Sequence, residues 1–295
     1  MINKICIVST PQDKNIQSVI NYLLCSSSSN FNVEVLNSPQ NLNHFIFQKN
    51  CYYYIRKIRS FNPDNLKEIE ELTSLFSYLS MKGLAIVNKM KVIPRQQILF
   101  KAEQLGISVP KNMITSLKSE VILFRKEVDC IVIKSIGDVI ISKDYNLNFK
   151  ANYVRELTLS QLKDFPDTFF PVYIEEKIVK KFEIRSFVVN KVFYSMAILS
   201  GSNEIDIRLV RRNSSTSYHP YLLPIEIQKK ILSLLKYLKI SSASIDIIYS
   251  HCNNYYLLDV NPGGQYTDIE YYCNANISKS YIIDLYEEFY QKNKE

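Results

Sequence analysis

The stretch Tyr255–Gln265, YYLLDVNPGGQ, decides the fold class and most of the functional interpretation. Its apolar run ends in Asp259, one spacer and Asn261, and a proline and two glycines follow directly. Because side chains alternate between the two faces of a strand, Asp259 and Asn261 are expected on the same face. Proline and glycine then end the strand and let the backbone pass close to a ligand.

The preceding strand carries a second acid. SIDIIYS, residues 244–250, is separated from it by the polar loop HCNN, and a hairpin centred between Cys252 and Asn253 would place Asp246 opposite Asp259. Two facing carboxylates repel each other across an antiparallel pair. A divalent cation would reverse that cost, and Asp and Asn oxygens suit Mg²⁺. The alternative interpretation is a hairpin with two acids on its solvent-exposed face.

Composition excludes several classes of protein. The 295 residues are 46% hydrophobic, and no apolar run approaches the ~18–20 residues of a membrane span. The six cysteines lack CxxC spacing, so neither a zinc site nor a disulfide framework is indicated, and a reducing, cytoplasmic location is expected. The net charge of +7 suits an acidic peptide or small molecule, and without a basic run no nucleic-acid or membrane partner is expected.

Strands and helices alternate along the chain, which indicates an α/β (α+β) protein. Residues 1–87 are predicted to form a small α/β domain that includes helices at Asn15–Cys25 and over PDNLKEIEELTSLFSYLSMKG. Further on, a helix is expected over PIEIQKKILSLLKYLK, and Asn190-Lys191 is a plausible tight turn between two strands.

Basic side chains follow strands upstream of the acids. FEIRSFVV places Glu183 and Arg185 on one face, and NEIDIRLV repeats the pattern with Arg208. Lys134 ends the apolar run CIVIK. Taken singly, each charge is better explained by a surface ion pair. Together with an acidic metal site they indicate a cradle for a nucleoside triphosphate, because arginine forks bind phosphate well.

The strand PVYIEEKIV ends in two acids, a junction that can bind adenine through its backbone or simply run into a charged turn. The chain has neither GxxxxGK[ST] nor GxGxxG. Gly137 is the one glycine positioned to assist phosphate binding.

The order of these motifs resembles the ATP-grasp superfamily: a lysine-ended strand, a strand ending in acids, E-I-R, D-x-R, S-I-D and acid-x-N-P. Over nearly the whole chain it is similar to the ATP-grasp peptide maturases that make graspetides, in particular the grasp-with-spasm type. The further correspondences are Arg56-Lys57, Asn88, Ala102, Gly106, Pro110, Ile114-Thr115, Leu223-Pro224 and the ending DVNPGGQ. No single motif is specific, whereas the ordered set is.

The resemblance implies an ATP-grasp fold in three parts. These are an N-terminal pre-ATP-grasp domain (1–87), a central lid subdomain (88–175) and a C-terminal antiparallel-sheet subdomain with the metal site (176–295).

The resemblance also assigns roles by matched position. The implied Mg²⁺ ligands are Asp246, Asp259 and Asn261, the last also touching the nucleotide. The other implied ATP contacts are Lys134 and Arg95 at the phosphates, Glu176, Lys177 and Ile178 at adenine, and Glu183 at the ribose. Arg185 and Arg208 match arginines near the γ-phosphate and the acyl phosphate. The departures from the family pattern are Arg95 for lysine, Asp259 for glutamate, Asn112 for threonine and Lys57 for arginine.

The implied activity is that of a carboxylate ligase that uses ATP and Mg²⁺. It would activate Asp or Glu side chains of a ribosomal precursor peptide as acyl phosphates and close ω-ester or ω-amide rings with Thr, Ser or Lys. The implied partner is that peptide, with a leader and an acidic core, and a homodimer is expected on the same grounds. Two alternatives stay open: a RimK-like ligase that adds amino acids to a protein tail or small molecule, and a non-catalytic nucleotide-binding scaffold.

Overall fold

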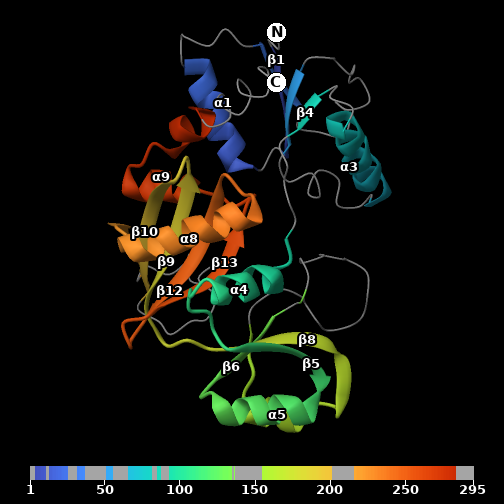
Figure 1. Ribbon diagram of the computed structural model, residues 1–295, viewed down its shortest axis with the longest axis vertical. Helices are drawn as coiled ribbons and strands as arrows, with labels where there is room; N and C mark the ends of the chain where they lie inside the picture. The colour runs from blue at the N-terminus through green and yellow to red at the C-terminus, as the bar shows by residue number, and fades with distance from the viewer. Residues whose placement is uncertain are drawn as a thin grey trace.

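The protein is described here from a computed structural model, which covers residues 4–10, 13–25, 32–36, 51–55, 66–81, 85–87, 93–134, 136, 155–200 and 216–283. Three sheets follow one another along the long axis, with the N-terminal sheet at the top of Figure 1 and the central one at the bottom. The mixed α/β class is thereby confirmed. Within the described residues, every helix is too short or too polar to cross a bilayer.

The N-terminal sheet is parallel and has the order β2-β1-β3-β4. Its strands are β1 (Lys4–Val8), β2 (Asn32–Leu36), β3 (Cys51–Ile55) and β4 (Ala85–Val87). Parallel neighbours need long crossovers, and helices α1 (Lys14–Cys25) and α3 (Leu66–Met81) lie in two of the connections. The predicted α/β pattern of this region is confirmed.

The central sheet is antiparallel, has the order β5-β8-β6-β7, and is covered on one face. Its elements are β5 (Asn112–Leu117), α5 (Lys118–Glu127), β6 (Ile131–Lys134), β7 (Arg155–Glu156), α6 (Leu159–Lys163) and β8 (Thr168–Glu176). Val121 and Phe124 of α5 pack with Ile174 in one core. Side chains alternate along β8, so Tyr173 and Glu175 occupy the other face.

The C-terminal sheet has the order β11-β10-β9-β12-β13 and is antiparallel throughout. Its strands are β9 (Lys180–Val189), β10 (Val192–Ser200), β11 (Thr216–Tyr221), β12 (Ala243–Ser250) and β13 (Tyr255–Asn261). Asn190 and Lys191 join β9 to β10 with φ of 50° and 63°, as a two-residue hairpin turn requires. The tight turn predicted there is confirmed.

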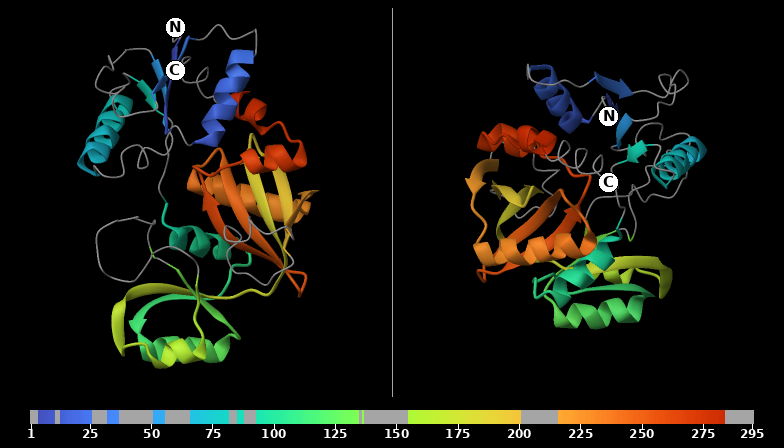
Figure 2. Two further views of the ribbon diagram at one scale, coloured as in Figure 1. Left: turned by 180° about the vertical axis from the view of Figure 1, so that it is seen from behind. Right: turned by 45° about the horizontal axis from the view of Figure 1, so that its top comes forward.

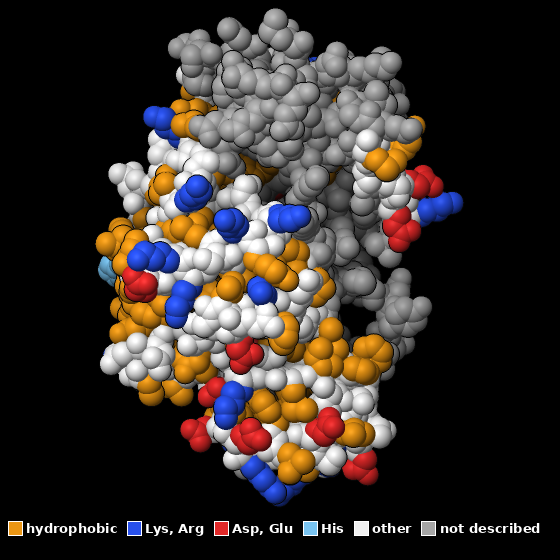
Figure 3. Space-filling model, viewed as in Figure 1, with side chains coloured by type: hydrophobic (Ala, Val, Ile, Leu, Met, Phe, Trp, Pro, Cys, Tyr) orange, Lys and Arg blue, Asp and Glu red, His pale blue; other side chains and the backbone are white. Residues whose placement is uncertain are grey.

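Helices α8 (Ile225–Leu238) and α4 (Arg95–Gln104) cover one face of this sheet. The apolar stripe of α8 is buried at Ile231, Leu234, Leu235 and Leu238. Figure 3 shows Lys and Arg side chains scattered over the face of the molecule on which α8 lies. The helix is therefore amphipathic in the way its sequence predicts.

The opposite face is shared between a second core and a polar region. Ile16 of α1 and Tyr54 of β3 pack with Phe187, Tyr266 and Tyr281. Helix α9 (Thr267–Cys273) belongs to this core, and Figures 1 and 2 show it beside α1. The N-terminal sheet is thus joined to the C-terminal one by a continuous apolar contact.

Leu234 tests the contribution of α8. It is 0% exposed, so Leu234→Ala should lower the free energy of unfolding by about 2–5 kcal/mol, through lost burial and the cavity left behind. Leu222 is 84% exposed, and Leu222→Ala should change it by less than about 0.5 kcal/mol. Urea titration followed by circular dichroism measures both, and equal effects would contradict the packing described.

Candidate active site on the C-terminal sheet

One row of side chains crosses the face of the C-terminal sheet opposite α8. The register pairs Met196 with Arg185, Arg185 with Asp246, and Asp246 with Asp259. Nε of Arg185 donates to Oδ1 of Asp246 at 2.9 Å, and Nη2 donates to Oδ2 at 3.4 Å. The predicted pairing of Asp246 with Asp259 is confirmed.

A β-bulge in β13 decides which face Asp259 occupies. Ile247 pairs with Leu257 and Asp246 with Asp259, so Leu258 is an extra residue in this strand. Without the bulge, Asp259 would share the face of Leu257, which is buried against the helices. The bulge re-aims the carboxylate toward the opposite face, a common use of bulges next to active sites.

The bulge also corrects one detail of the sequence prediction. Tyr249 pairs with Tyr255, so the turn is centred on Cys252 and not between Cys252 and Asn253. The extra residue in β13 then restores the pairing predicted for the two acids. The position of the turn was wrong by half a residue, because the sequence pattern did not reveal the irregularity.

The bulge is held by Arg95, the first residue of α4. Its Nε donates to the carbonyl oxygen of Leu258 at 3.1 Å. Burial raises the pKa of Asp259, the neighbouring Arg95 opposes that rise, and the nearby Asp246 carboxylate adds to it. Asp259 is therefore a desolvated carboxylate next to a like charge, which is an environment that a cation would stabilise.

The residues at this end of the sheet fit a magnesium ion in donor chemistry. Two carboxylates face each other, and Asn261 adds a carboxamide oxygen at the next position on the same face of β13. Oδ1 of Asn261 accepts from the N–H of Gly263 at 2.9 Å, which orients the side chain and leaves a lone pair. The described residues contain no cluster of three or more His, Cys, Asp or Glu side chains, so the set rests on two acids and one amide.

Lys134 approaches the acids from the central sheet. It forms a buried ion pair with Glu175 of β8, and Asp259 and Arg95 lie close enough to influence its charge. Burial lowers the pKa of Lys134, and Glu175 opposes that effect. The structure thus brings Arg95, Lys134 and Asp259 together, as the sequence analysis expected, and adds a partner for the lysine.

Among the described residues, two buried polar atoms beside this ion pair have no hydrogen-bond partner at normal geometry. They are Oε2 of Glu175 and the hydroxyl of Tyr173, which share one face of β8. Burial raises the pKa of Tyr173, so its phenol stays neutral. Sequence reasoning missed both residues. The two-acid ending of PVYIEEKIV was the available signal, since alternation places Glu175 and Glu176 on opposite faces.

The predicted ribose acid, Glu183, lies on the same face of β9 as Arg185. Burial raises its pKa, and the ion pair that it forms with Lys180 opposes the rise. Asp246 and Arg185 also influence Glu183, so it borders the polar row.

The predicted adenine junction is partly occupied by the protein itself. The N–H of Glu176 donates to the carbonyl of Lys111 at 2.8 Å, and that of Lys177 donates to the carbonyl of Cys130 at 2.8 Å. Within the described part of the chain, the N–H of Ile178 has no partner. Of the three residues predicted at the adenine junction, Ile178 is therefore the one whose backbone N–H can bind a base.

Several sequence-level candidates lie outside the described residues. They are Arg208, which was assigned to the γ-phosphate region, and Arg56, Lys57, Asn88 and Gly137. All other residues assigned to the nucleotide or the metal lie within the described part of the chain.

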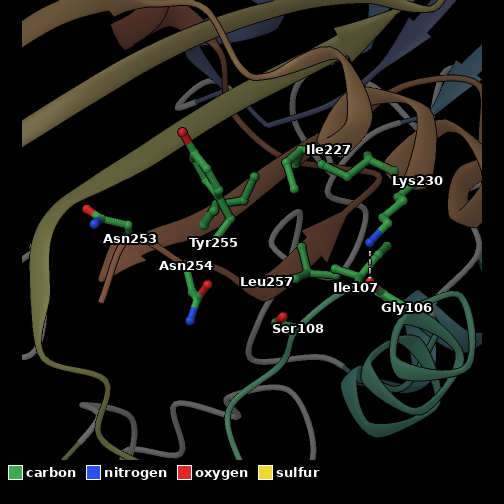
Figure 4. A pocket seen from close by; sticks show the side chains of 11 residues that line it. Gly106, Ile107, Ser108, Ile227, Lys230, Asn253, Asn254, Tyr255 and Leu257 are labelled. Carbon is green, nitrogen blue, oxygen red and sulfur yellow. Dashed lines mark hydrogen bonds between the residues drawn. The ribbon is translucent and has the colours of Figure 1, made fainter. Parts of the chain in front are cut away.

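Figure 4 shows a pocket on the other face of the sheet, and its lining includes no residue of the polar row. It is lined by Ile247 and Leu257, which point toward α8, and Lys230 at its edge donates to the carbonyl of Gly106 at 2.6 Å. Its volume of about 140 Å³ is below the roughly 300–1,000 Å³ of typical ligand sites. It is too small for a nucleotide.

No protein-family model matches the chain, and no curated protein matches it. Solved structures do. The chain is similar to the macrocyclase MdnC bound with precursor peptide MdnA from Microcystis aeruginosa MRC, with 20% identity, a TM-score of 0.70, and coverage of 91% of this chain and 94% of that one.

Two further structures extend the comparison. A Chryseobacterium gregarium RiPP-associated ATP-grasp ligase in complex with ADP and a leader and core peptide has 20% identity, a TM-score of 0.70, and coverage of 94% of this chain and 95% of that one. D-alanine–D-alanine ligase from Bacillus anthracis has 16% identity, a TM-score of 0.55, and coverage of 95% and 91%. These likenesses show that the chain has the ATP-grasp fold, as predicted.

Glu175 provides a test of the electrostatics. Because its charge raises the pKa of Lys134 against the effect of burial, Glu175→Gln should lower that pKa further. NMR titration of reductively ¹³C-methylated protein, with Lys134→Arg to assign the resonance, measures the shift. Glu127→Gln, a change at an exposed acid on α5, is the control and should leave the resonance where it is. An unchanged or raised pKa in Glu175→Gln would contradict the ion pair.

Proposed function

We propose that this ATP-grasp chain is a ligase that uses ATP and Mg²⁺ to close ω-ester or ω-amide rings in a ribosomal precursor peptide. One observation carries the proposal: Asp246 and Asp259 face each other beside Arg185, Arg95 and Lys134. Facing carboxylates repel each other across a purely structural sheet, and beside these cations they are suited to holding a metal-bound triphosphate.

The nucleotide would lie between the central and C-terminal sheets. Asp246, Asp259 and Asn261 would hold Mg²⁺, which when bound neutralises charge on the β- and γ-phosphates. Lys134 and Arg95 would bind phosphate oxygens, Glu183 the ribose, and the N–H of Ile178 the base.

The reaction would proceed in two steps, phosphoryl transfer to the peptide and then ring closure. A carboxylate oxygen of a peptide Asp or Glu attacks the γ-phosphorus, and the bond to ADP breaks, giving an acyl phosphate. A Thr or Ser hydroxyl or a Lys amine of the same peptide then attacks the acyl carbon and loses its proton, and phosphate leaves. No protein nucleophile is needed.

Arg185 is suited to stabilise the transferred group. Its guanidinium has five N–H donors, of which two engage Asp246. The remaining donors can bind oxygens of the phosphoryl group as charge develops on them. Asp246 would hold the guanidinium in place meanwhile. Arg208 would contribute a second guanidinium to the same role.

Support for a peptide substrate comes from the relatives. MdnC is bound with precursor peptide MdnA, and the Chryseobacterium ligase is in complex with a leader and core peptide. The net charge of +7 would attract an acidic core peptide. A homodimer, a cytoplasmic location and domain boundaries at residues 87 and 175 belong to the same proposal. The free thiols of Cys25 and Cys130 are compatible with that location.

The likeness to D-alanine–D-alanine ligase supports a second candidate function, that of a ligase that adds amino acids to an acceptor molecule and closes no ring. The macrocyclase comparison has the higher TM-score, 0.70 against 0.55. Mass spectrometry separates the two, because each ring closure removes one water from the peptide whereas addition of an amino acid increases its mass.

The central test uses a candidate precursor peptide, short and rich in Thr and in Asp or Glu, together with ATP and Mg²⁺. The wild type should release ADP and remove one water per link, whereas Asp259→Ala should lose at least about 100-fold in rate with the fold intact, because it removes a metal ligand. Asp129→Ala, a change at an exposed acid, is the control and should retain activity. Wild-type rates of cyclisation by Asp259→Ala would refute the assignment.

A further inference from the structure

Asn15 connects the N-terminal domain to the turn that follows the candidate metal site. It is the second residue of α1 and is 0% exposed. Its Nδ2 donates to the carbonyl of Gly264 at 2.9 Å, and its Oδ1 accepts from the N–H of Tyr266 at 3.1 Å. One carboxamide therefore fixes both a carbonyl and an N–H of a turn about 250 residues away in the sequence.

Asn15 is itself held by a helix cap. Asp13 is fully buried and precedes α1, and its Oδ1 accepts from the N–H of Asn15 at 3.2 Å. Its Oδ2 accepts from the hydroxyl of Ser9 at 3.1 Å. The start of α1 is thus rigid, and the carboxamide has a defined direction before it meets the turn.

The anchored turn has little freedom. The N–H of Gly264 donates to the carbonyl of Asn261 at 3.0 Å, and the N–H of Gly263 donates to Oδ1 of Asn261 at 2.9 Å. A Cβ on Gly264 would lie 1.9 Å from Oγ of Ser244 on β12, so the backbone passes close against the strand. Movement at Gly264 would therefore displace the carboxamide of Asn261.

We propose that Asn15 is a positioning residue for Mg²⁺ binding, and so for the metal-dependent binding of the nucleotide, acting through Gly264 and Tyr266 on Asn261. This rests on the proposed function, because Asn261 is the side chain assigned there to the metal. A contact that only stabilises the fold would not affect metal affinity in particular. Asn15, which lies in the N-terminal domain, instead sets the direction of the Asn261 side chain, a metal ligand at the end of β13. Groups that orient a ligand typically contribute about 10- to 100-fold to metal affinity.

The first experiment separates positioning from stability. In Asn15→Ala, calorimetric titration with ADP in the presence of Mg²⁺ should show binding about 10- to 100-fold weaker than in wild type, whereas ADP in the presence of EDTA should bind equally well. Lys14→Ala, a change at the exposed neighbouring residue, is the control and should match wild type in both titrations. Equal weakening with and without metal would overturn the proposal.

The second experiment does not depend on any ligand. Amide hydrogen exchange of the segment 262–267 should be faster in Asn15→Ala than in wild type, because the N–H of Tyr266 loses its acceptor. Unchanged exchange would overturn the anchoring itself. If wild type fails to bind ADP with Mg²⁺ while exchange responds as expected, the proposed function fails and the anchor stands.

A double-mutant cycle tests the route through Asn261. If Asn15 acts on the metal through this side chain, Asn15→Ala combined with Asn261→Ala should bind Mg²⁺-ADP no more weakly than Asn261→Ala alone. Additive losses would overturn the proposal. If Asn15→Ala does not fold, Asn15→Asp replaces it in these experiments. This variant keeps the shape of the side chain and the acceptor for the N–H of Tyr266, but it loses the donor to the carbonyl of Gly264. Loss of the fold in both variants would assign Asn15 to stability and also overturn the proposal.

Discussion

The rest of the site depends on the repulsion between two carboxylates, Asp246 and Asp259, that face each other on neighbouring strands. A sheet tolerates such a pair when positive charge surrounds it. Here Arg185 comes from the neighbouring strand, Arg95 from the start of α4, and Lys134 from the central sheet. The acids therefore require the two antiparallel sheets and α4 to meet at one place, and this requirement couples the packing of the subdomains to the candidate chemistry.

One face of the C-terminal sheet packs under α8, and the other carries the polar row. The bulge in β13 determines which of the two faces the residues around it occupy. Strict alternation would place either Leu257 or Val260 on the polar face, because the two residues are three positions apart. With the extra residue Leu258, both side chains enter the core under α8, and Asp259 points away from it. The carbonyl of Leu258 then accepts a hydrogen bond from Arg95, so the irregularity in the strand also positions a candidate phosphate ligand.

Local patterns predicted the elements better than the contacts between them. Helical spacing predicted α8, the Asn190-Lys191 turn was found as expected, and the period of two placed Asp259 and Asn261 on one face. Helix α9 and strand β11 were missed, because their short sequences carry no distinct period.

Long-range contacts gave still less signal. The pairing of Lys134 with Glu175 joins strands with a long insertion between them, and the contacts of Asn15 with residues 264 and 266 span nearly the whole chain. Such contacts depend on tertiary packing and leave no periodic signal in the sequence. Charge balance explains why they matter: in the region assigned to the metal, the phosphates and the ribose, four described carboxylates each lie beside one of four cations. The carboxylates are Glu175, Glu183, Asp246 and Asp259, and the cations are Arg95, Lys134, Lys180 and Arg185. A triphosphate entering this balanced set would bring excess negative charge, so its binding would depend on a divalent cation and on any residue that fixes that cation's ligands.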